Sequence, residues 1–391
     1  MARIFLKRGR ANPLWHGHPW VYSGAVEREE GATQPGDVVD VCDAQGRFIG
    51  RGFINPRSQI RVRLLTWQDE AVDAALLERR LQEAVRLRKR LGFPSADTNA
   101  YRLVNSEGDG LPGVAIDAYG DVAAVQFTAL GMKRLDQTLF DLLAGPLGFR
   151  SVVEVSAGHF AEVEGFASAT RTVRGPEVVT VPCRELGLQL EVDPLHGQKT
   201  GMFLDQRDNR RRIGELARDG ARVLDLYTYA GGFALAALKG GASLATCVDT
   251  SARALERARR HAELNRLGPL ELHEVDVFRF LEQVRPRSYD IVIVDPPKFA
   301  RSRKDLTAAL KGYERLNALA LNVCAEDALL LSCSCSQQVA GDNFEKVLAG
   351  AARNAGRRLE LLELRSQGAD HPIPPAFPEG RYLTAALCRV I

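Results

Sequence analysis

Hydrophobic and polar positions follow different periods in different parts of the chain. Up to residue 68, short strand-like segments such as RIFL (3–6) and QIRVRLL (59–65) are separated by Gly and Pro. This pattern predicts short β-strands in a small barrel. In residues 69–92, apolar side chains recur at steps of three and four, which predicts an amphipathic helix that links two domains.

The remaining pattern changes from mixed to alternating. Residues 100–190 combine strand-like runs with one helix expected near 131–144. From about residue 195, near-continuous apolar runs alternate with helical periods, including a helix expected near 305–325. Strands of this kind are typical of a parallel sheet that helices cover on both faces.

The predicted fold class is therefore α/β with three parts, which suits a length of 391 residues. We expect a β-barrel at 1–68 and a linker helix with a small α+β domain at 69–190. A Rossmann-like, doubly wound and mostly parallel sheet is expected at 191–391.

The composition excludes several protein classes. Hydrophobic residues make up 45% and charged residues 26%, as in ordinary globular proteins. No apolar run approaches membrane-spanning length and the N-terminus has no signal-peptide pattern, so we expect no membrane partner. Seven cysteines without a C-x-x-C pair indicate a reduced, cytoplasmic protein and give no sign of a metal site.

The basic charge is concentrated at the N-terminal end. The formal net charge is +3; residues 1–68 hold ten Lys or Arg and six Asp or Glu, whereas the other 323 residues hold 42 and 43. This asymmetry suits a polyanionic partner, although a normal solvated surface explains it equally well. Trp15, Trp20 and Tyr22 are expected in the barrel core rather than as stacking platforms.

Polar residues follow the strands of the predicted sheet, where ligands bind in such folds. The first strand ends in Asp225-Leu-Tyr-Thr-Tyr-Ala-Gly-Gly, and Asp249 lies 24 residues later, where an acid can accept ribose hydroxyls. Neither G-x-G-x-x-G nor a P-loop is present, so the pattern favours an adenosine cofactor without phosphates, S-adenosylmethionine (SAM), with S-adenosylhomocysteine (SAH) as product. The motif order resembles class I methyltransferases. The candidate cofactor residues are Asp225, Tyr227, Thr228, Gly231, Gly232, Asp249, Thr250, Asp276, Val277 and Asp295.

Two features of this cofactor site leave alternatives open. The usual acid-x-Gly-x-Gly-x-Gly loop keeps only Gly231, because Tyr227 and Tyr229 replace the other glycines. Asp249 and Asp276 alternatively serve only as caps of helices or turns.

The segment before the first Rossmann strand is a second source of cofactor contacts. Phe203, Asp205 and Gln206 lie where the chain can fold over the cofactor, with Phe203 against adenine or the methionine chain and Asp205 at the amino group. Arg207 and Arg210 are candidates for RNA phosphates, or alternatively solvated charges at a helix start.

The chemistry is predicted from two neighbouring strand ends. Asp295-Pro-Pro-Lys298 suits recognition of a nucleobase, and the next strand carries Cys333 and Cys335. A thiolate that adds to carbon 6 of cytosine makes carbon 5 nucleophilic enough to accept a methyl group. Cys335 lies nearer the carboxyl end of its strand, so we favour it as the nucleophile, with Asp295 assisting near N3. Buried, inert thiols are the alternative.

At this point the sequence resembles a known family, the bacterial 23S rRNA large subunit methyltransferase I (RlmI) type. The motifs that carry the resemblance cover nearly the whole chain and include GHPWVYSGAV (17–26), HGQKTGMFLDQRDNR (196–210), DPPKF (295–299), SCS (334–336) and DHPIPPAFPEGRYL (370–383).

The resemblance implies an N-terminal PUA-like RNA-binding barrel, a small middle domain and a C-terminal methyltransferase domain. It also implies SAM-dependent methylation of cytosine C5 in 23S rRNA or a large-subunit particle, with Cys335 as the nucleophile. Lys298 stands where many RNA cytosine-C5 methyltransferases carry a second cysteine, so it is a third catalytic candidate and the base that removes the C5 proton stays open. Lys7, Arg8, Arg10 and His18 are expected to contact RNA, and a homodimer is plausible.

Two other functions remain open from the sequence. The first is an exocyclic-amine nucleic-acid methyltransferase that uses Asp295-Pro-Pro-Lys298 without covalent catalysis. The second is a non-catalytic RNA-assembly factor that binds SAM only for structure.

Overall fold

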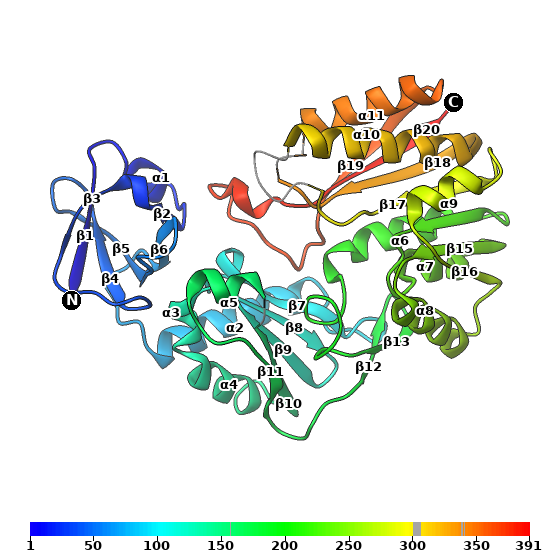
Figure 1. Ribbon diagram of the computed structural model, residues 1–391. Coiled ribbons are helices and arrows are strands. Elements are labelled where there is room, and N and C mark those ends of the chain that lie inside the picture. The colour runs from blue at the N-terminus through cyan, green and yellow to red at the C-terminus, as the bar shows by residue number, and fades with distance from the viewer. Residues whose placement is uncertain (157, 300–305, 338, 340) are drawn as a thin grey trace. The chain divides into compact units, whose positions relative to one another are not determined.

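The computed structural model describes residues 1–156, 158–299, 306–337, 339 and 341–391. The chain forms two compact units (Figure 1). Unit 1 contains Met1–Arg184, Glu191–Asp205 and Ala369–Gly380, and unit 2 contains Glu185–Leu190, Gln206–Gly368 and Arg381–Ile391. No helix among the described residues is long and apolar enough to cross a membrane.

Unit 1 begins with a six-stranded sheet of order β2-β6-β5-β4-β1-β3. Its elements are β1 (Ala2–Leu6), α1 (Asn12–Trp15), β2 (Trp20–Tyr22), β3 (Val26–Glu30), β4 (Val38–Cys42), β5 (Phe48–Ile54) and β6 (Ile60–Thr66). Alternate side chains of these strands, including Ile4, Leu6, Val39 and Val41, enclose a small apolar core. The short strands expected between the Gly and Pro positions are therefore confirmed.

The second part of unit 1 is an α+β layer. A sheet of order β11-β10-β9-β8-β7 packs against α2 and α4. The elements are α2 (Ala74–Arg90), β7 (Ala100–Asn105), β8 (Val114–Tyr119), β9 (Val122–Phe127), α3 (Leu130–Lys133), α4 (Asp136–Ala144), β10 (Ser151–Ser156), α5 (His159–Glu164) and β11 (Ala169–Arg174). The paired strands β12 (Val181–Glu185) and β13 (Leu188–Val192) follow, and Glu185–Leu190 of this pair belongs to unit 2. The single helix expected near 131–144 is instead two helices, because the chain leaves helical geometry at Leu135.

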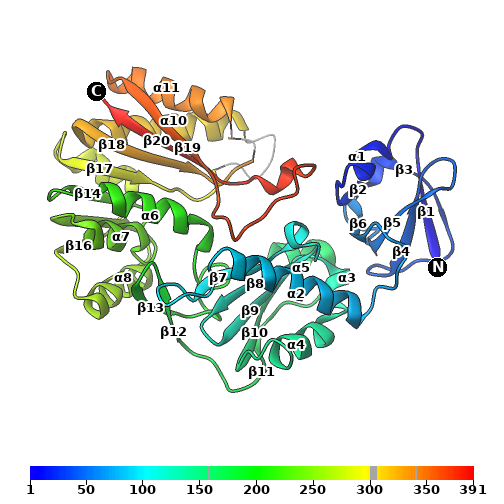
Figure 2. The same ribbon diagram turned by 180° about the vertical axis from the view of Figure 1, so that it is seen from behind.

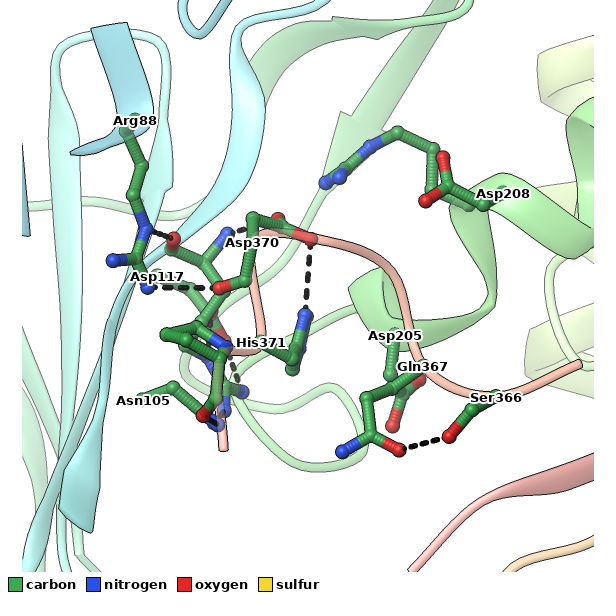
Figure 3. Close-up of polar contacts among 12 residues, drawn as sticks. Arg88, Asn105, Asp117, Asp205, Asp208, Ser366, Gln367, Asp370 and His371 are labelled. Carbon is green, nitrogen blue, oxygen red and sulfur yellow. Dashed lines mark hydrogen bonds and ion pairs between the residues drawn. The ribbon is translucent and has the colours of Figure 1, made fainter. Parts of the chain in front are cut away.

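A buried ionic network in unit 1 fixes the segment that begins at Ala369. The Arg88 guanidinium binds both carboxylate oxygens of Asp109, at 2.5 and 2.7 Å, and donates to the Asp370 carbonyl at 2.8 Å. The Asp370 carboxylate contacts His371 Nδ1 at 3.0 Å, and the Asn105 amide donates to the Pro372 carbonyl (Figure 3). Because these charges are buried and mutually satisfied, they hold this segment in one conformation.

Unit 2 is a seven-stranded sheet of order β16-β15-β14-β17-β18-β20-β19, in which only β20 runs antiparallel to its neighbours. Its elements are α6 (Arg207–Leu216), β14 (Arg222–Leu226), α7 (Gly232–Gly240), β15 (Leu244–Asp249), α8 (Ala252–Asn265), β16 (Leu270–Glu274), α9 (Val277–Gln283), β17 (Tyr289–Val294), α10 (Leu306–Val323), β18 (Cys324–Ser334), α11 (Asp342–Ala355), β19 (Leu359–Arg365) and β20 (Thr384–Val390). The doubly wound fold is confirmed. The helix expected near 305–325 is α10, and residue 305 lies outside the described residues.

Helices cover both faces of this sheet (Figures 1 and 2). Val223 packs with α6, α7 and α8 on one face, and its neighbour Leu224 packs with α9, α10 and α11 on the other. This two-sided burial explains why the strands of unit 2 are nearly continuous apolar runs in the sequence. The strand order reverses between β14 and β17, so the loops after these strands open onto the edge where ligands bind in such sheets.

Candidate active site

The loop after β14 keeps a glycine-type backbone with tyrosines in place of glycine. The φ angles are +61° at Tyr227, +50° at Tyr229 and +79° at Gly231, which are the three glycine positions of the usual loop. A left-handed backbone costs a residue with a side chain about 1–2 kcal/mol. A Cβ at Gly231 would lie only 2.9 Å from the Ala258 Cβ, so that position requires glycine.

Asp225 is the carboxylate at the centre of this loop. It is 1% exposed, and its Oδ2 accepts hydrogen bonds from Thr228 Oγ1 at 2.6 Å and from the Ala234 amide at 3.1 Å. Its Oδ1 is buried and has no hydrogen-bond partner among the described residues. Burial raises the pKa of Asp225 to about 7, against the lowering effect of the two hydrogen bonds. An unsatisfied buried carboxylate oxygen fits the cationic amino group of SAM.

Asp249 and Asp276 both accept hydrogen bonds from backbone amides. Asp249 accepts from the amides of Tyr229 and Ser251, each at 2.9 Å, and Asp276 caps α9 by accepting from the Arg279 amide at 3.1 Å. The capping role is therefore present at both positions. A carboxylate has about four acceptor sites, so these contacts leave room for ribose or adenine groups.

The two residues after these acids differ in their placement. Thr250 is exposed at the end of β15, whereas the Val277 side chain is buried between α9 and the sheet. A side chain in that position contributes to the core, so only the Val277 backbone is available to a ligand.

The segment before α6 is divided between the two units. Phe203 and Asp205 belong to unit 1, where Lys199 Nζ lies 4.4 Å from the Phe203 ring centre and 2.9 Å from Asp205 Oδ2. Gln206 belongs to unit 2, and its Nε2 donates to Asp295 Oδ2 at 3.0 Å. The expected cofactor contacts of Phe203 and Asp205 stay predictions, and the Gln206 amide is directed at a catalytic candidate.

Three of the expected RNA contacts lie in the interior, which corrects the sequence-based prediction. Arg207 and Arg210 are buried and both pair with Glu185; Arg210 Nε lies 2.7 Å from its carboxylate. His18 is buried and pairs with Glu379 at 3.3 Å. Buried groups that are already paired are not available to phosphates. Their partners are distant in sequence, so the charge pattern could not reveal this burial.

Lys7, Arg8 and Arg10 are exposed, as an RNA-contacting surface requires. Trp15, which was expected in the barrel core, is 48% exposed on α1, and Tyr22 is 41% exposed. The core expectation is therefore wrong for these two aromatic residues, because α1 and β2 direct them away from the apolar cluster.

Cys335 differs from the other cysteines in its exposure. Six of the seven are buried, and Cys335 is only partly buried just beyond β18, with its Sγ 4.0 Å from the Pro296 carbonyl. Cys333 lies two residues earlier in the core, where burial and the charge of Asp295 raise the pKa of its thiol well above the ordinary value. Of the two cysteines singled out from the sequence, only Cys335 is accessible to a base.

Tyr313 on α10 is a site residue that the sequence analysis missed. Burial, together with the nearby Cys335 and Asp295, raises the pKa of its hydroxyl to about 12. Its ring lies 4.7 Å from that of Phe299, in the DPPKF segment. No sequence signal marks Tyr313, because its position depends on how α10 packs beneath β17 and β18.

Lys298 is exposed and its catalytic role stays a prediction.

Comparisons with known proteins agree with this geometry. A PUA-like domain model matches residues 4–67, and an S-adenosylmethionine-dependent methyltransferase model matches residues 162–379. The chain is 39% identical, over the full length of both proteins, to a ribosomal RNA large subunit methyltransferase I from Erwinia tasmaniensis and to one from Escherichia coli K12.

The chain belongs to the ribosomal RNA large subunit methyltransferase I family. It is a SAM-dependent methyltransferase with an N-terminal PUA-like domain, so the predicted family and cofactor are confirmed. A SAM-dependent methyltransferase structure from Streptococcus mutans matches the whole chain with a TM-score of 0.84 at 23% identity. A methyltransferase structure in complex with SAH matches with a TM-score of 0.86 at 23% identity. These two structures confirm the fold.

The left-handed backbone at Tyr229 predicts an unusual order of stability. Tyr229→Gly should be more stable than Tyr229→Ala by about 1 kcal/mol, because only the alanine variant retains the backbone strain. Arg259, which is exposed in α8, is the control; there the alanine variant should be the more stable one by about 1 kcal/mol. Urea unfolding of the four variants measures both differences. The same order at both positions would contradict the strain.

The raised pKa of Asp225 predicts pH-dependent ligand binding. A ligand ammonium at Oδ1 favours the ionised carboxylate, so SAH affinity should fall by up to about tenfold per pH unit below pH 7. Calorimetry at pH 6 and pH 8, in two buffers of different ionisation enthalpy, measures the affinity and the proton released. Asp225→Asn should bind SAH more weakly and lose the dependence.

The raised pKa of Asp225 also makes the stability of the ligand-free protein depend on pH. The folded pKa of Asp225 is raised from 3.8 to about 7, so the folded state binds a proton that the unfolded state lacks in this range. The contribution of this group to the stability of the ligand-free protein is therefore lost as pH rises through 7.

For the binding prediction, a wild-type SAH affinity that does not change between pH 6 and pH 8 would contradict the role of Asp225.

Proposed function

We propose that the protein methylates carbon 5 of a cytosine in large-subunit ribosomal RNA, through a covalent bond between Cys335 and carbon 6. The observation that carries this proposal is the placement of Cys335, the one cysteine of seven that is not buried, beside the Asp295-Pro296 strand end. The names of the relatives support the ribosomal RNA substrate, and the PUA-like domain supports an RNA partner.

The covalent step begins at the Cys335 sulfur. The thiolate adds to carbon 6 of cytosine, and the electron pair of the C5–C6 double bond moves so that carbon 5 becomes nucleophilic. Asp295 lies at the adjoining strand end, where its carboxyl group assists the addition by hydrogen bonding at the N3 side of the base. SAM supplies the methyl group that carbon 5 accepts, and the products are the methylated adduct and SAH.

Release of the methylated base requires that the bond between Cys335 and carbon 6 be broken. A base removes the proton from carbon 5, the C5–C6 double bond forms again, and the thiolate of Cys335 leaves. The cofactor is held by Asp225 at its amino group and by Asp249 and Asp276 at the nucleoside, since these carboxylates lie at the carboxyl ends of the neighbouring strands β14, β15 and β16.

The N-terminal end supplies a surface for RNA. Lys7, Arg8 and Arg10 are exposed within ten residues of the exposed Trp15. Basic groups that bind phosphates, together with an aromatic ring that can stack on a base, are the combination that structured RNA requires. We propose that these four residues contact the ribosomal RNA backbone and an unpaired base.

Replacement of Cys335 tests the chemistry. With methyl-labelled SAM and ribosomal RNA or large subunits, the wild type should label 5-methylcytidine, and Cys335→Ala should reduce the rate by at least about 10³-fold because the nucleophile is lost. Cys333→Ala is the matched control and should remain active. RNA that contains 5-fluorocytidine should trap a covalent complex with the wild type and not with Cys335→Ala. Label in an N-methyl nucleoside, or an active Cys335→Ala variant, would contradict covalent C5 chemistry.

Salt dependence tests the RNA surface. Replacement of Lys7, Arg8 and Arg10 by alanine should reduce the magnitude of the slope of log affinity against log salt concentration by about 2–3. Each phosphate contact that is lost removes the release of about one counterion on binding. Alanine at Lys346 and Arg353, two exposed cations on α11, is the control. Filter binding at several salt concentrations measures the slope, and an equal loss in both sets would contradict a specific N-terminal surface.

A further inference from the structure

A chain of hydrogen bonds leads to the catalytic candidate Asp295 within unit 2. Arg365 Nε donates to Asn209 Oδ1 at 2.9 Å, Asn209 Nδ2 donates to Gln206 Oε1 at 2.6 Å, and Gln206 Nε2 donates to Asp295 Oδ2 at 3.0 Å. Gln206 and Asn209 are buried. These residues come from three separate segments: the end of β19, the start of α6 and the end of β17.

The donor-to-acceptor direction of these hydrogen bonds is determined by the residues at the two ends of the series. A guanidinium group only donates hydrogen bonds, so the oxygen of the Asn209 amide must face Arg365. The Asn209 NH₂ group then faces Gln206, whose own oxygen accepts and whose NH₂ group faces Asp295. Each amide is therefore oriented by the one before it, and the last donor always points at Asp295 Oδ2.

Arg365 is itself held in place by charge. Its guanidinium binds Glu363 at 2.6 Å and the Asp208 carbonyl at 3.1 Å, and Arg212 binds the same Glu363 carboxylate at 2.7 Å. The cation at the start of the chain therefore has a fixed position on β19 and cannot rotate away without loss of these contacts.

We propose that Gln206 and Asn209 are positioning residues that fix the orientation and the ionisation of Asp295. A donor at Oδ2 favours the ionised carboxylate and requires that any proton on Asp295 reside on Oδ1. The carboxyl group then meets the target base with one defined oxygen. This inference rests on the proposed function, because it takes Asp295 as the group that faces the cytosine.

Other titratable groups also face Asp295. Among the described residues they include Asp225 at the end of β14, Tyr313 on α10, Cys333 on β18 and Cys335 just beyond it, which interact electrostatically with Asp295 or with its neighbours. Burial raises the pKa of Asp225 to about 7, so its titration also affects the pH profile, and each variant is therefore compared with the wild type.

Asn209→Asp is the decisive variant because residue 209 does not contact Asp295 in the chain described above. An aspartate at 209 still accepts from Arg365 but cannot donate to Gln206. The Gln206 amide should therefore rotate, donate to residue 209 and present its oxygen to Asp295. Two facing acceptors favour a protonated Asp295, which is the form that donates to N3 of cytosine, so the basic limb of the kcat profile should move up by about one pH unit. Gln206→Leu removes the donor and should shift the limb in the same direction, with about a tenfold loss of kcat.

The measurement is the pH dependence of single-turnover methyl transfer to ribosomal RNA or large subunits, with SAH binding and thermal unfolding recorded for each variant. Asn354→Asp on α11, which likewise removes a side-chain amide donor, in this case to the Glu314 carboxylate, is the matched control and should leave the profile unchanged. If Gln206→Leu does not fold, the nearly isosteric Asn209→Asp still decides the result.

The proposal would be overturned if the folded Asn209→Asp and Gln206→Leu variants had the same pH profile as the wild type. Lower thermal stability with an unchanged profile would also overturn it, since that is the result of a purely structural role. A wild type that forms an N-methyl nucleoside would contradict the proposed C5 chemistry, but the profile of that methyl transfer would still show whether the two amides control Asp295.

Discussion

Burial of Asp225 at the end of β14 is the constraint on which the active-site edge depends. Its carboxylate accepts from the Thr228 hydroxyl and the Ala234 amide, and so joins the end of β14 to the first turn of the next helix. Asp249 adds a bond from the Tyr229 amide, so two acids hold one loop. These contacts stabilise a left-handed backbone at two tyrosines, where the local conformational preference opposes it.

Burial also separates two cysteines that the sequence makes nearly equivalent. Cys333 points into the core between the sheet and the helices α6 to α8, where a thiolate is unfavourable. Cys335 comes just after the end of β18, where the sheet no longer covers it, beside the proline-rich turn after β17. The length of β18 therefore determines which thiol can meet a substrate.

Arginine has different roles in different parts of this chain. Arg88 and Arg210 are interior cations that each bind a buried carboxylate with two hydrogen bonds, and they join segments distant in sequence. Arg8 and Arg10 are exposed and carry the basic character of the N-terminal end. Counting charges gives the same weight to both kinds, although only the exposed cations are available to a polyanion.

The sequence by itself determined the fold class, the cofactor and the order of the strand-end motifs. These properties depend on hydrophobic period and on residues that follow strands directly, so they are local in the chain. The boundaries at 68 and 190 and the catalytic roles stay predictions. The tertiary structure alone decided that Arg207, Arg210 and His18 are buried, that Trp15 is exposed, and that Gln206 is directed at Asp295. Each of these depends on partners from distant segments, such as Glu185, Glu379 and Asp295. The physical reason is that burial and hydrogen bonding are properties of the packed chain, whereas periodicity is a property of neighbours in sequence.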